Sequence, residues 1–254
     1  MALIEEMDRS GNWLFRWRSF LPLALYVMAF VVIWSEADNR YLQTHQGWVL
    51  LCVSVSLLGQ LIRALAIGFT PRGTSGRNTK EGQVAEALNT KGIYSLVRHP
   101  LYLGNFFMWM GLVLYVANHW FSLVCVLLFW LYYERIMFAE EYFLRNKFGK
   151  PYLTWAAKTP AFIPRISGWK QPGVFFSIRN VLKREYNGFF AIFLSFTLLN
   201  VLKNYQRTHS TDLYELVDDI WIIPFFFSLA TFLLLRTLKK RTRVLDVEGR
   251  EYIS

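Results

Sequence analysis

The chain alternates long apolar stretches with polar segments along most of its length. A helix that crosses a bilayer needs about 20 consecutive apolar residues. Six stretches approach or reach that length, namely Phe20–Trp34, Gly47–Phe69, Pro100–Asn118, His119–Ala139, Tyr186–Asn200 and Ile220–Leu235. The first is short, so we expect it to extend at one end or to lie in a thinned bilayer. The pattern therefore predicts an all-α polytopic integral membrane protein with about six transmembrane helices.

The third and fourth predicted spans follow each other with only a tight turn at Asn118 between them. Short connections join antiparallel neighbours, so these two spans are predicted to form a helical hairpin. The start of the third span and the end of the fourth then lie at the same membrane face. Functional side chains near Pro100 and Ala139 would therefore lie close together at that face.

Composition and charge agree with a membrane protein. Of the 254 residues, 54% are hydrophobic and only 18% are charged, which is too apolar for an ordinary soluble domain. The net charge of +10 could indicate nucleic acid, but the charges flank the apolar stretches instead. If the N-terminus is cytoplasmic, only Arg40, Lys203 and Arg207 fall in outward segments, as the positive-inside rule favours. Both termini are therefore predicted to be cytoplasmic, with no nucleic-acid partner.

Two further features of the sequence exclude other classes of protein. Cys52 and Cys125 both lie in apolar runs, so they are expected to be free, buried thiols rather than a disulfide. The first residues, MALIEEMDRSGNW, are polar and acidic and do not have the design of a cleavable signal peptide. No metal site is predicted.

The segment Gly92–Gly104, GIYSLVRHPLYLG, is the first candidate for chemistry. Pro100 suits the first position of a helix, which makes His99 the expected N-cap. The exposed N–H groups of that helix start, together with Arg98 and His99, would suit a carboxylate or a phosphate. Gly104 removes a side chain one turn later, where a flat group could lie against the backbone. The alternative is a basic cluster that only anchors the helix.

Glu140 and Glu141 are the second candidate. They stand at the end of the fourth predicted span, where acidic residues oppose the helix dipole, so helix stability does not explain them. The hairpin would bring them beside Arg98, which suits a zwitterionic amino-acid group. Tyr94 and Tyr102 add aromatic faces for a nucleoside or a sulfonium. A solvated glutamate pair outside the lipid is the alternative.

These motifs follow the order G-x-Y-x-x-x-R-H-P-x-Y-x-G, E-E-x-x-L-x-x-x-F-G-x-x-Y and P-x-F-I-P. Over Asn89–Arg165 the chain thereby resembles the isoprenylcysteine carboxyl methyltransferase family, whose wider group includes membrane phospholipid methyltransferases. The resemblance implies S-adenosylmethionine as the cofactor and a lipid or lipidated acceptor from the bilayer. It implies a cofactor site of Tyr94, His99, Pro100, Leu101, Tyr102 and Glu140, to which the residue arguments add Arg98, Gly104 and Glu141. The stretch Glu86–Asn89 corresponds to a further cofactor-binding stretch of the family.

The acceptor is harder to predict. In eukaryotic members of the family an Arg four residues before the first Glu contacts the substrate, whereas here that position is Ile136 and Arg135 lies beside it. The loop TSGRNT and the segment after it are more similar to a bacterial branch that includes lipid A 1-phosphate methyltransferases. A phosphate acceptor needs cationic partners. The candidates are Arg63, Arg135 and Arg165, with Arg72 and Arg77 as further possibilities.

The sequence thus predicts an S-adenosylmethionine-dependent methyltransferase of the bacterial inner membrane that O-methylates a lipid phosphate. Residues 1–19 would be an interfacial arm, 20–166 the methyltransferase core, and 167–254 an extension with two further spans. Carboxyl methylation of a prenylcysteine and N-methylation of a phospholipid amine are alternative reactions. An NADPH-dependent sterol or acyl reductase and a non-catalytic scaffold are alternatives of other classes.

Overall fold

A computed structural model describes residues 2–18, 22–35, 45–71, 74, 77–79 and 82–247. The helices are α1 (Leu3–Trp17), α2 (Pro22–Ser35), α4 (Gln46–Gly68), α5 (Pro100–Val116), α6 (His119–Phe148), α7 (Lys150–Ala156), α8 (Ile178–Thr208), α9 (Leu213–Leu216) and α10 (Asp219–Arg241). Two 3-10 turns, η1 (Ile93–Ser95) and η2 (Ile166–Gly168), and a short antiparallel pair, β1 (Arg77–Thr79) with β2 (Gly82–Val84), complete the described elements. The predicted all-α polytopic architecture is confirmed.

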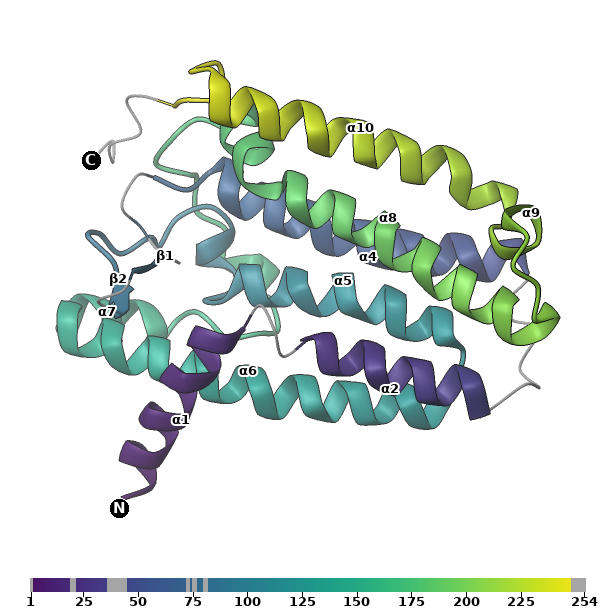
Figure 1. Cartoon of the computed structure of the whole chain (residues 1–254). Helices are drawn as coiled ribbons and strands as arrows, with labels where there is room; N and C mark the ends of the chain where they lie inside the picture. The colour runs from purple at the N-terminus through teal and green to yellow at the C-terminus, as the bar shows by residue number, and fades with distance from the viewer. Residues whose placement is uncertain are drawn as a thin grey trace.

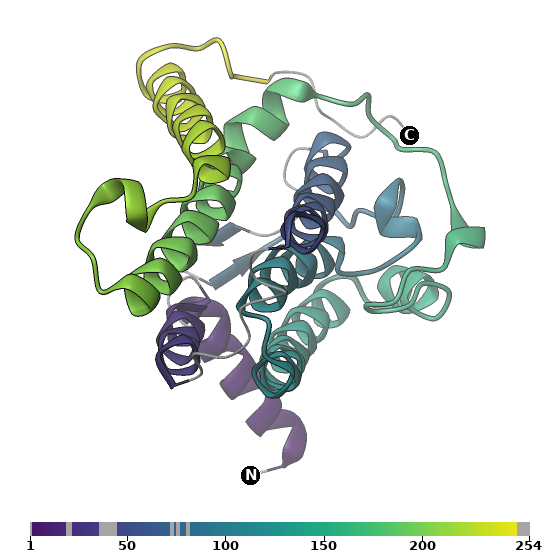
Figure 2. The same ribbon diagram turned by 90° about the vertical axis from the view of Figure 1, so that its right-hand side faces the viewer.

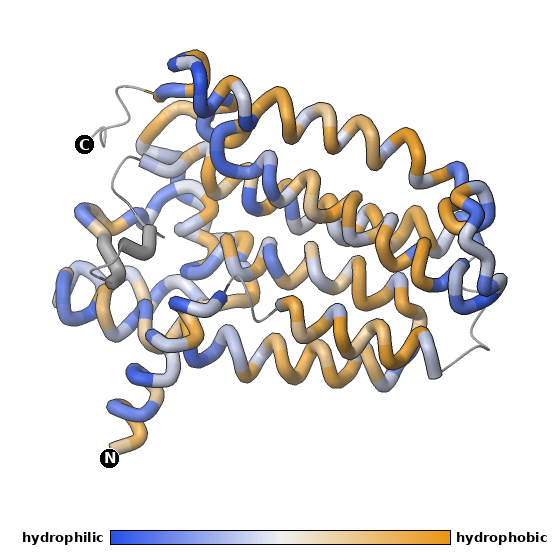
Figure 3. Tube along the Cα trace, viewed as in Figure 1, coloured by the Kyte–Doolittle hydropathy of each residue, from blue (hydrophilic) through white to orange (hydrophobic). Residues whose placement is uncertain are grey.

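The long helices form one bundle and run along a common direction (Figure 1). Among the described helices, α4, α6, α8 and α10 are long and apolar enough to cross a membrane, and α2 and α5 are shorter apolar helices. Apolar residues occupy the middle of the bundle, and polar residues gather at its two ends (Figure 3). Helix α5 begins and α10 ends at the same end, which also carries α7. We call this the α7 end.

The hairpin of α5 and α6 is present, but α6 is longer than expected. Ala117 and Asn118 connect the two helices, with Ala117 in a left-handed conformation (φ 61°). Helix α6 continues past Ala139 to Phe148 and stops only at Gly149, whose φ is 56°. No helix-breaking residue stands between these two points, so propensity carries the helix onward. The glutamate pair therefore lies within the helix rather than at its end.

The C-terminal extension also departs from the expected boundaries. Helix α8 begins at Ile178, after Ser177 caps it, and continues to Thr208, so it exceeds Tyr186–Asn200 at both ends. Lys203 consequently lies inside α8, where it is buried, and not in an outward loop. Its ammonium donates to the carbonyl of Tyr115 in the last turn of α5. A cation is favourable at that position because the carbonyls of a helix C-terminus carry partial negative charge.

Helices α4 and α5 pack closely because glycines face each other. A Cβ on Gly59 would lie 2.4 Å from the carbonyl oxygen of Gly104, and a Cβ on Gly104 would lie 2.8 Å from that of Gly59. Small residues let helix backbones approach in this way within membranes. The contact fixes the position of α5 along the axis of α4, and therefore the position of His99 at the start of α5.

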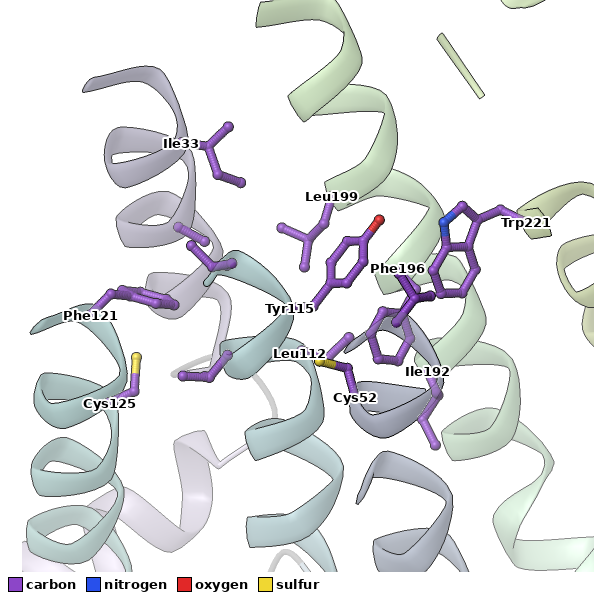
Figure 4. Close-up of a cluster of buried hydrophobic side chains, with 14 residues drawn as sticks. Ile33, Cys52, Leu112, Tyr115, Phe121, Cys125, Ile192, Phe196, Leu199 and Trp221 are labelled. Atoms are coloured by element: carbon purple, nitrogen blue, oxygen red, sulfur yellow. The ribbon is translucent and has the colours of Figure 1, made fainter. Parts of the chain in front are cut away.

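The main core lies where α2, α4, α5, α6 and α8 meet (Figure 4). Phe196 stacks on Trp221 at a centroid distance of 5.1 Å and meets Tyr115 edge to face at 5.2 Å. Cys52 and Cys125 are buried and free, as predicted. The rings join α8 and α10 to the hairpin, so the C-terminal extension packs on the rest of the bundle.

The view from the opposite end shows how the remaining segments surround this core (Figure 2). Helices α8 and α10 lie on one side, and the extended segment between α7 and α8 follows the periphery. Helix α1 packs against α6, and a Cβ on Gly11 would lie 2.1 Å from the carbonyl oxygen of Arg135. The polar N-terminal segment is thus a helix held against the bundle in its described part.

Candidate functional site

A cavity of about 370 Å³ opens at the α7 end. Several parts of the chain surround it: the residue after α1, the C-terminal part of α4, residues 85–89, the start of α5, the C-terminal half of α6 with α7, and the start of α8. Its lining is rich in charged and aromatic residues, among them Arg18, Arg63, Tyr94, Arg98, His99, Tyr102, Asn105, Tyr133, Glu140, Glu141, Tyr152, Trp155, Arg184 and Glu185. The volume suits a small organic ligand.

Glu141 binds both cations at the start of α5. Its Oε1 lies 2.8 Å from Arg98 Nε and 2.8 Å from His99 Nε2. The guanidinium of Arg98 also donates to the carbonyl oxygens of Ala156 and Thr159, each at 2.8 Å. His99 is the N-cap and Pro100 the first residue of α5, as predicted. Glu141 therefore neutralises part of the positive charge that Arg98 and His99 bring to the start of α5.

Glu140 faces the same turn from the next position of α6. Its Oε2 accepts from the Tyr102 hydroxyl at 2.8 Å and lies 3.6 Å from His99 Nδ1. The rings of His99 and Tyr102 stack at a centroid distance of 5.5 Å and an interplanar angle of 17°. Both contacts of Glu140 use the same oxygen, and a carboxylate has four acceptor positions, so capacity for a ligand ammonium remains.

The two glutamates set the charge of His99. Burial by itself would lower the pKa of the imidazole, but hydrogen bonds and charge from Glu140 and Glu141 exceed that effect, and the pKa is raised. The side chain of His99 is only 5% exposed. The two carboxylates therefore favour the charged form of the imidazole.

Arg63 lies on the wall formed by α4 and α8. Its Nη2 and Nε lie 2.7 Å and 2.8 Å from the two oxygens of Glu185, which is 4% exposed. Its Nη1 donates to Asn105 at 2.7 Å, and Asn105 donates in turn to the hydroxyl of Tyr133. Gln60 also donates to Glu185, at 3.0 Å. The predicted acceptor residue Arg63 thus reaches the cavity as part of a buried polar network.

Some of the other predicted site residues line the cavity, and others lie away from it. Pro100 and Leu101 line the cavity, and so do residues 87–89 of the expected cofactor-binding stretch. Gly104 packs on α4, since a Cβ there would lie 2.4 Å from Arg63 Cγ; the expected open surface for a flat group is absent at this residue. Arg135 donates to Ser10 of α1, and Arg165 lies on the exposed connection after α7.

Arg135 and Arg165 therefore lie outside the lining of the described cavity, so their prediction as acceptor residues is not supported by position. Arg135 points to α1 because one step along a helix turns a side chain by about 100°. Arg72 lies outside the described residues, and of Arg77 only the backbone is described.

Sequence reasoning missed the contribution of α1 and α8. Arg18 follows α1, and Arg184 and Glu185 belong to α8, yet all three line the cavity. A signal was present for Glu185, because an acidic residue next to an apolar run of a membrane helix marks a paired or functional position. The partner, Arg63, lies 122 positions earlier and could not be assigned from spacing.

The charge pattern of the cavity fits the amino-acid end of S-adenosylmethionine. Carboxylates suited to an ammonium lie beside the cationic start of α5, and Tyr94 and Tyr102 offer aromatic faces to a sulfonium. Among the described residues, no cluster of His, Cys, Asp and Glu side chains is arranged to hold a metal ion. Fold and site together define a polytopic helical membrane protein with a buried, charge-rich small-molecule cavity at one end.

Comparison with known proteins names the family. A family profile described as phospholipid methyltransferase matches residues 42–151. A probable protein-S-isoprenylcysteine O-methyltransferase of Oryza sativa subsp. indica is 31% identical over 136 residues, which are 53% of this chain and 68% of that protein. The protein-S-isoprenylcysteine O-methyltransferase of Schizosaccharomyces pombe is 33% identical over 43% of this chain and 46% of that protein. The chain belongs to this family of membrane methyltransferases, as its motifs predicted.

A relative that is named for metal resistance also matches. A nickel-cobalt-cadmium resistance protein of Alcaligenes xylosoxydans xylosoxydans is 31% identical over 59% of this chain and 64% of that protein. The chain thus spans between about half and two thirds of the length of these relatives. No solved structure matches the chain.

Proposed function

We propose that this chain transfers a methyl group from S-adenosylmethionine, held in the cavity at the α7 end, to the phosphate of a membrane lipid similar to lipid A 1-phosphate. One observation carries the proposal. The His99–Tyr102 turn of α5 and the Glu140–Glu141 pair of α6 converge on one cavity, with contacts of 2.8 Å between them. A zwitterionic cofactor matches that combination of charges.

Glu140 is assigned the cofactor's ammonium, and the start of α5 its carboxylate. Tyr94, Leu101 and Tyr102 would hold the nucleoside and the sulfonium. When bound, S-adenosylmethionine supplies an electrophilic methyl group. Glu141 acts indirectly, because its hydrogen bonds hold Arg98 and His99 in position. Such fixed groups keep the reacting atoms in line, which is the main requirement of a displacement reaction.

The overall charge of the lining favours an anionic acceptor. Five cationic side chains line the cavity when His99 is protonated, against three carboxylates; the cations are Arg18, Arg63, Arg98, Arg184 and His99. Arg63 of α4 and Arg184 of α8 both line the cavity. A phosphate monoester is already a nucleophile, so the site needs positioning charge rather than a general base.

The distribution of exposed cations supports a cytoplasmic side for the reaction. The α7 end carries the Lys and Arg residues of the connection after α7 and of the last turn of α10. By the positive-inside rule this end faces the cytoplasm, as expected for an enzyme of a bacterial inner membrane.

The test is a methyl-transfer assay on purified protein in lipid nanodiscs with S-adenosylmethionine labelled in its methyl group. Three acceptors are compared: a lipid A phosphomonoester, a farnesylated cysteine with a free carboxylate, and phosphatidylethanolamine. The proposal expects label in the phosphomonoester, and none with Glu140→Gln. No label in any acceptor, with a cofactor that binds, would contradict the assigned acceptor class.

Carboxyl methylation of a prenylcysteine is the second candidate, because the rice and fission yeast relatives carry that name. It shares the cofactor site and also takes an anionic acceptor. Label in the farnesylated cysteine alone would establish this reaction in place of phosphate methylation.

A further inference from the structure

A second, larger cavity lies behind the wall of the first. Its volume is about 780 Å³, and Leu88 and Trp155 line both cavities, so these side chains separate the two. We call it the basic groove. Its lining includes Lys150, Lys158, Arg165 and Lys170.

Every charged residue in this lining is a cation. Lys150 and Lys158 come from α7 and the residue pair after it, and Arg165 and Lys170 from the segment that crosses beside them. All four are exposed, and no carboxylate stands among the lining residues. Threonines of α7 and of residue 90 also line the groove. Such a cluster of cations and hydroxyls is suited to a phosphate.

The segment beside the groove is apolar and exposed. Ile163 and Ile166 are 80% and 83% exposed, and Trp169 and Phe175 are 52% and 88% exposed. Figure 2 shows this connection at the periphery of the bundle, where it is open to the surroundings of the helices. Exposed aromatic and aliphatic side chains alternating with Lys and Arg are typical of a segment at a membrane surface.

The depth of this segment agrees with that interpretation. Phe176 packs on Phe69 at the end of the apolar helix α4, with ring centroids 5.0 Å apart, and the amide of Ser177 donates to the carbonyl of Gly68. The C-terminal end of this segment therefore lies level with the end of a membrane-spanning helix. A lipid headgroup of the adjoining leaflet is at the same level.

We infer that the basic groove binds the phosphate headgroup of an anionic phospholipid, with the acyl chains against the exposed apolar side chains of residues 163–175. The inference does not depend on methyl transfer, because the groove shares only Leu88 and Trp155 with the lining of the cofactor cavity. It assigns a lipid-binding role to Arg165, which lies outside the cofactor cavity.

Native mass spectrometry tests the inference on the full chain. The protein is released from nanodiscs with equal amounts of phosphatidylglycerol and phosphatidylcholine, and the ratio of the two retained lipids is measured. The parent is expected to retain phosphatidylglycerol preferentially. Lys158→Gln with Lys170→Gln is expected to lower that preference by about thirtyfold, since each cation near an anionic surface contributes about fivefold.

Lys240→Gln with Arg241→Gln is the matched control, because it removes two exposed cations from the same end at the last turn of α10. It should retain the parental lipid ratio, and so should Lys158→Arg with Lys170→Arg. Binding of S-adenosylhomocysteine, unchanged in all variants, checks the fold. An equal loss in the groove and control variants would overturn the inference. So would displacement of the lipid by equimolar glycerol phosphate, which would indicate a site for free phosphates.

Discussion

Glu185 of α8 holds Arg63 of α4 through both oxygens of its carboxylate, at 2.7 Å and 2.8 Å. This pair joins the C-terminal extension to the wall of the cavity at the α7 end. A core that stops at residue 166 would leave out Arg184 and Glu185, although both line the cavity. The pair therefore makes α8 part of the candidate site rather than a separate brace.

Glu185→Gln is expected to lower the free energy of unfolding in detergent by about 3 kcal/mol, because it leaves the guanidinium of Arg63 largely buried without a counter-charge. Thermal unfolding followed by circular dichroism measures this. The control, Lys183→Gln, lies on the same helix and breaks an exposed pair with Asp246, which should change stability little because water screens exposed ion pairs. Equal losses of unfolding free energy in the two variants would mean that the Arg63–Glu185 pair stabilises the protein no more than an exposed ion pair does.

Gly104→Ala is expected to destabilise the protein by about 1–3 kcal/mol, because the added methyl would lie 2.4 Å from Arg63 Cγ and 2.8 Å from the carbonyl of Gly59. It should also weaken cofactor binding, since it displaces α5. Gly47→Ala, near the start of α4, meets only the ring of His45 at 3.2 Å and serves as control. Unchanged stability of Gly104→Ala would contradict the close packing of α4 on α5.

His99 is expected to make stability depend on pH. Its folded pKa is raised by Glu140 and Glu141 against the effect of burial, so its contribution is fully present below the unfolded pKa, about 6.5. The contribution is lost as the pH rises through the folded pKa. The melting temperature of the parent should therefore fall more between pH 6 and pH 9, relative to that of His99→Gln.

His119→Gln provides the control for this measurement. His119 is exposed at the opposite end of α6, away from both glutamates. That variant should follow the parental dependence on pH. A parental curve that matches His99→Gln across the whole range would show that the imidazole is not held in its charged form.

The sequence predicted those parts of the site that depend on local chemistry. Pro100 fixes the start of α5 and makes His99 its N-cap, and the short link at Asn118 brings Glu140 beside that start. What it could not predict were contacts between distant helices. Nothing local to Arg98 says that Glu141 takes up its charge, and nothing near Arg63 indicates Glu185.

The predicted helix boundaries were wrong where polar residues of good helix propensity adjoin an apolar run. The end of hydrophobicity near Ala139 indicated the end of a span, but α6 continues through residues of good helix propensity to Gly149. The same effect starts α8 at Ile178, eight residues before the apolar run. Hydropathy marks the depth of the membrane, whereas caps and glycines mark the ends of the helix.

The most direct test of the central claim is calorimetry on the purified protein in detergent, with S-adenosylhomocysteine and NADPH titrated side by side. We expect the adenosyl compound to bind and NADPH not to bind. Glu140→Gln should weaken the adenosyl compound by about tenfold or more, because it removes a charge-assisted hydrogen bond to the ammonium. Glu134→Gln, exposed on the same helix and outside the cavity lining, should bind as the parent does. Binding of NADPH alone, or of neither compound by folded protein, would contradict the assignment of this cavity to a methyl donor.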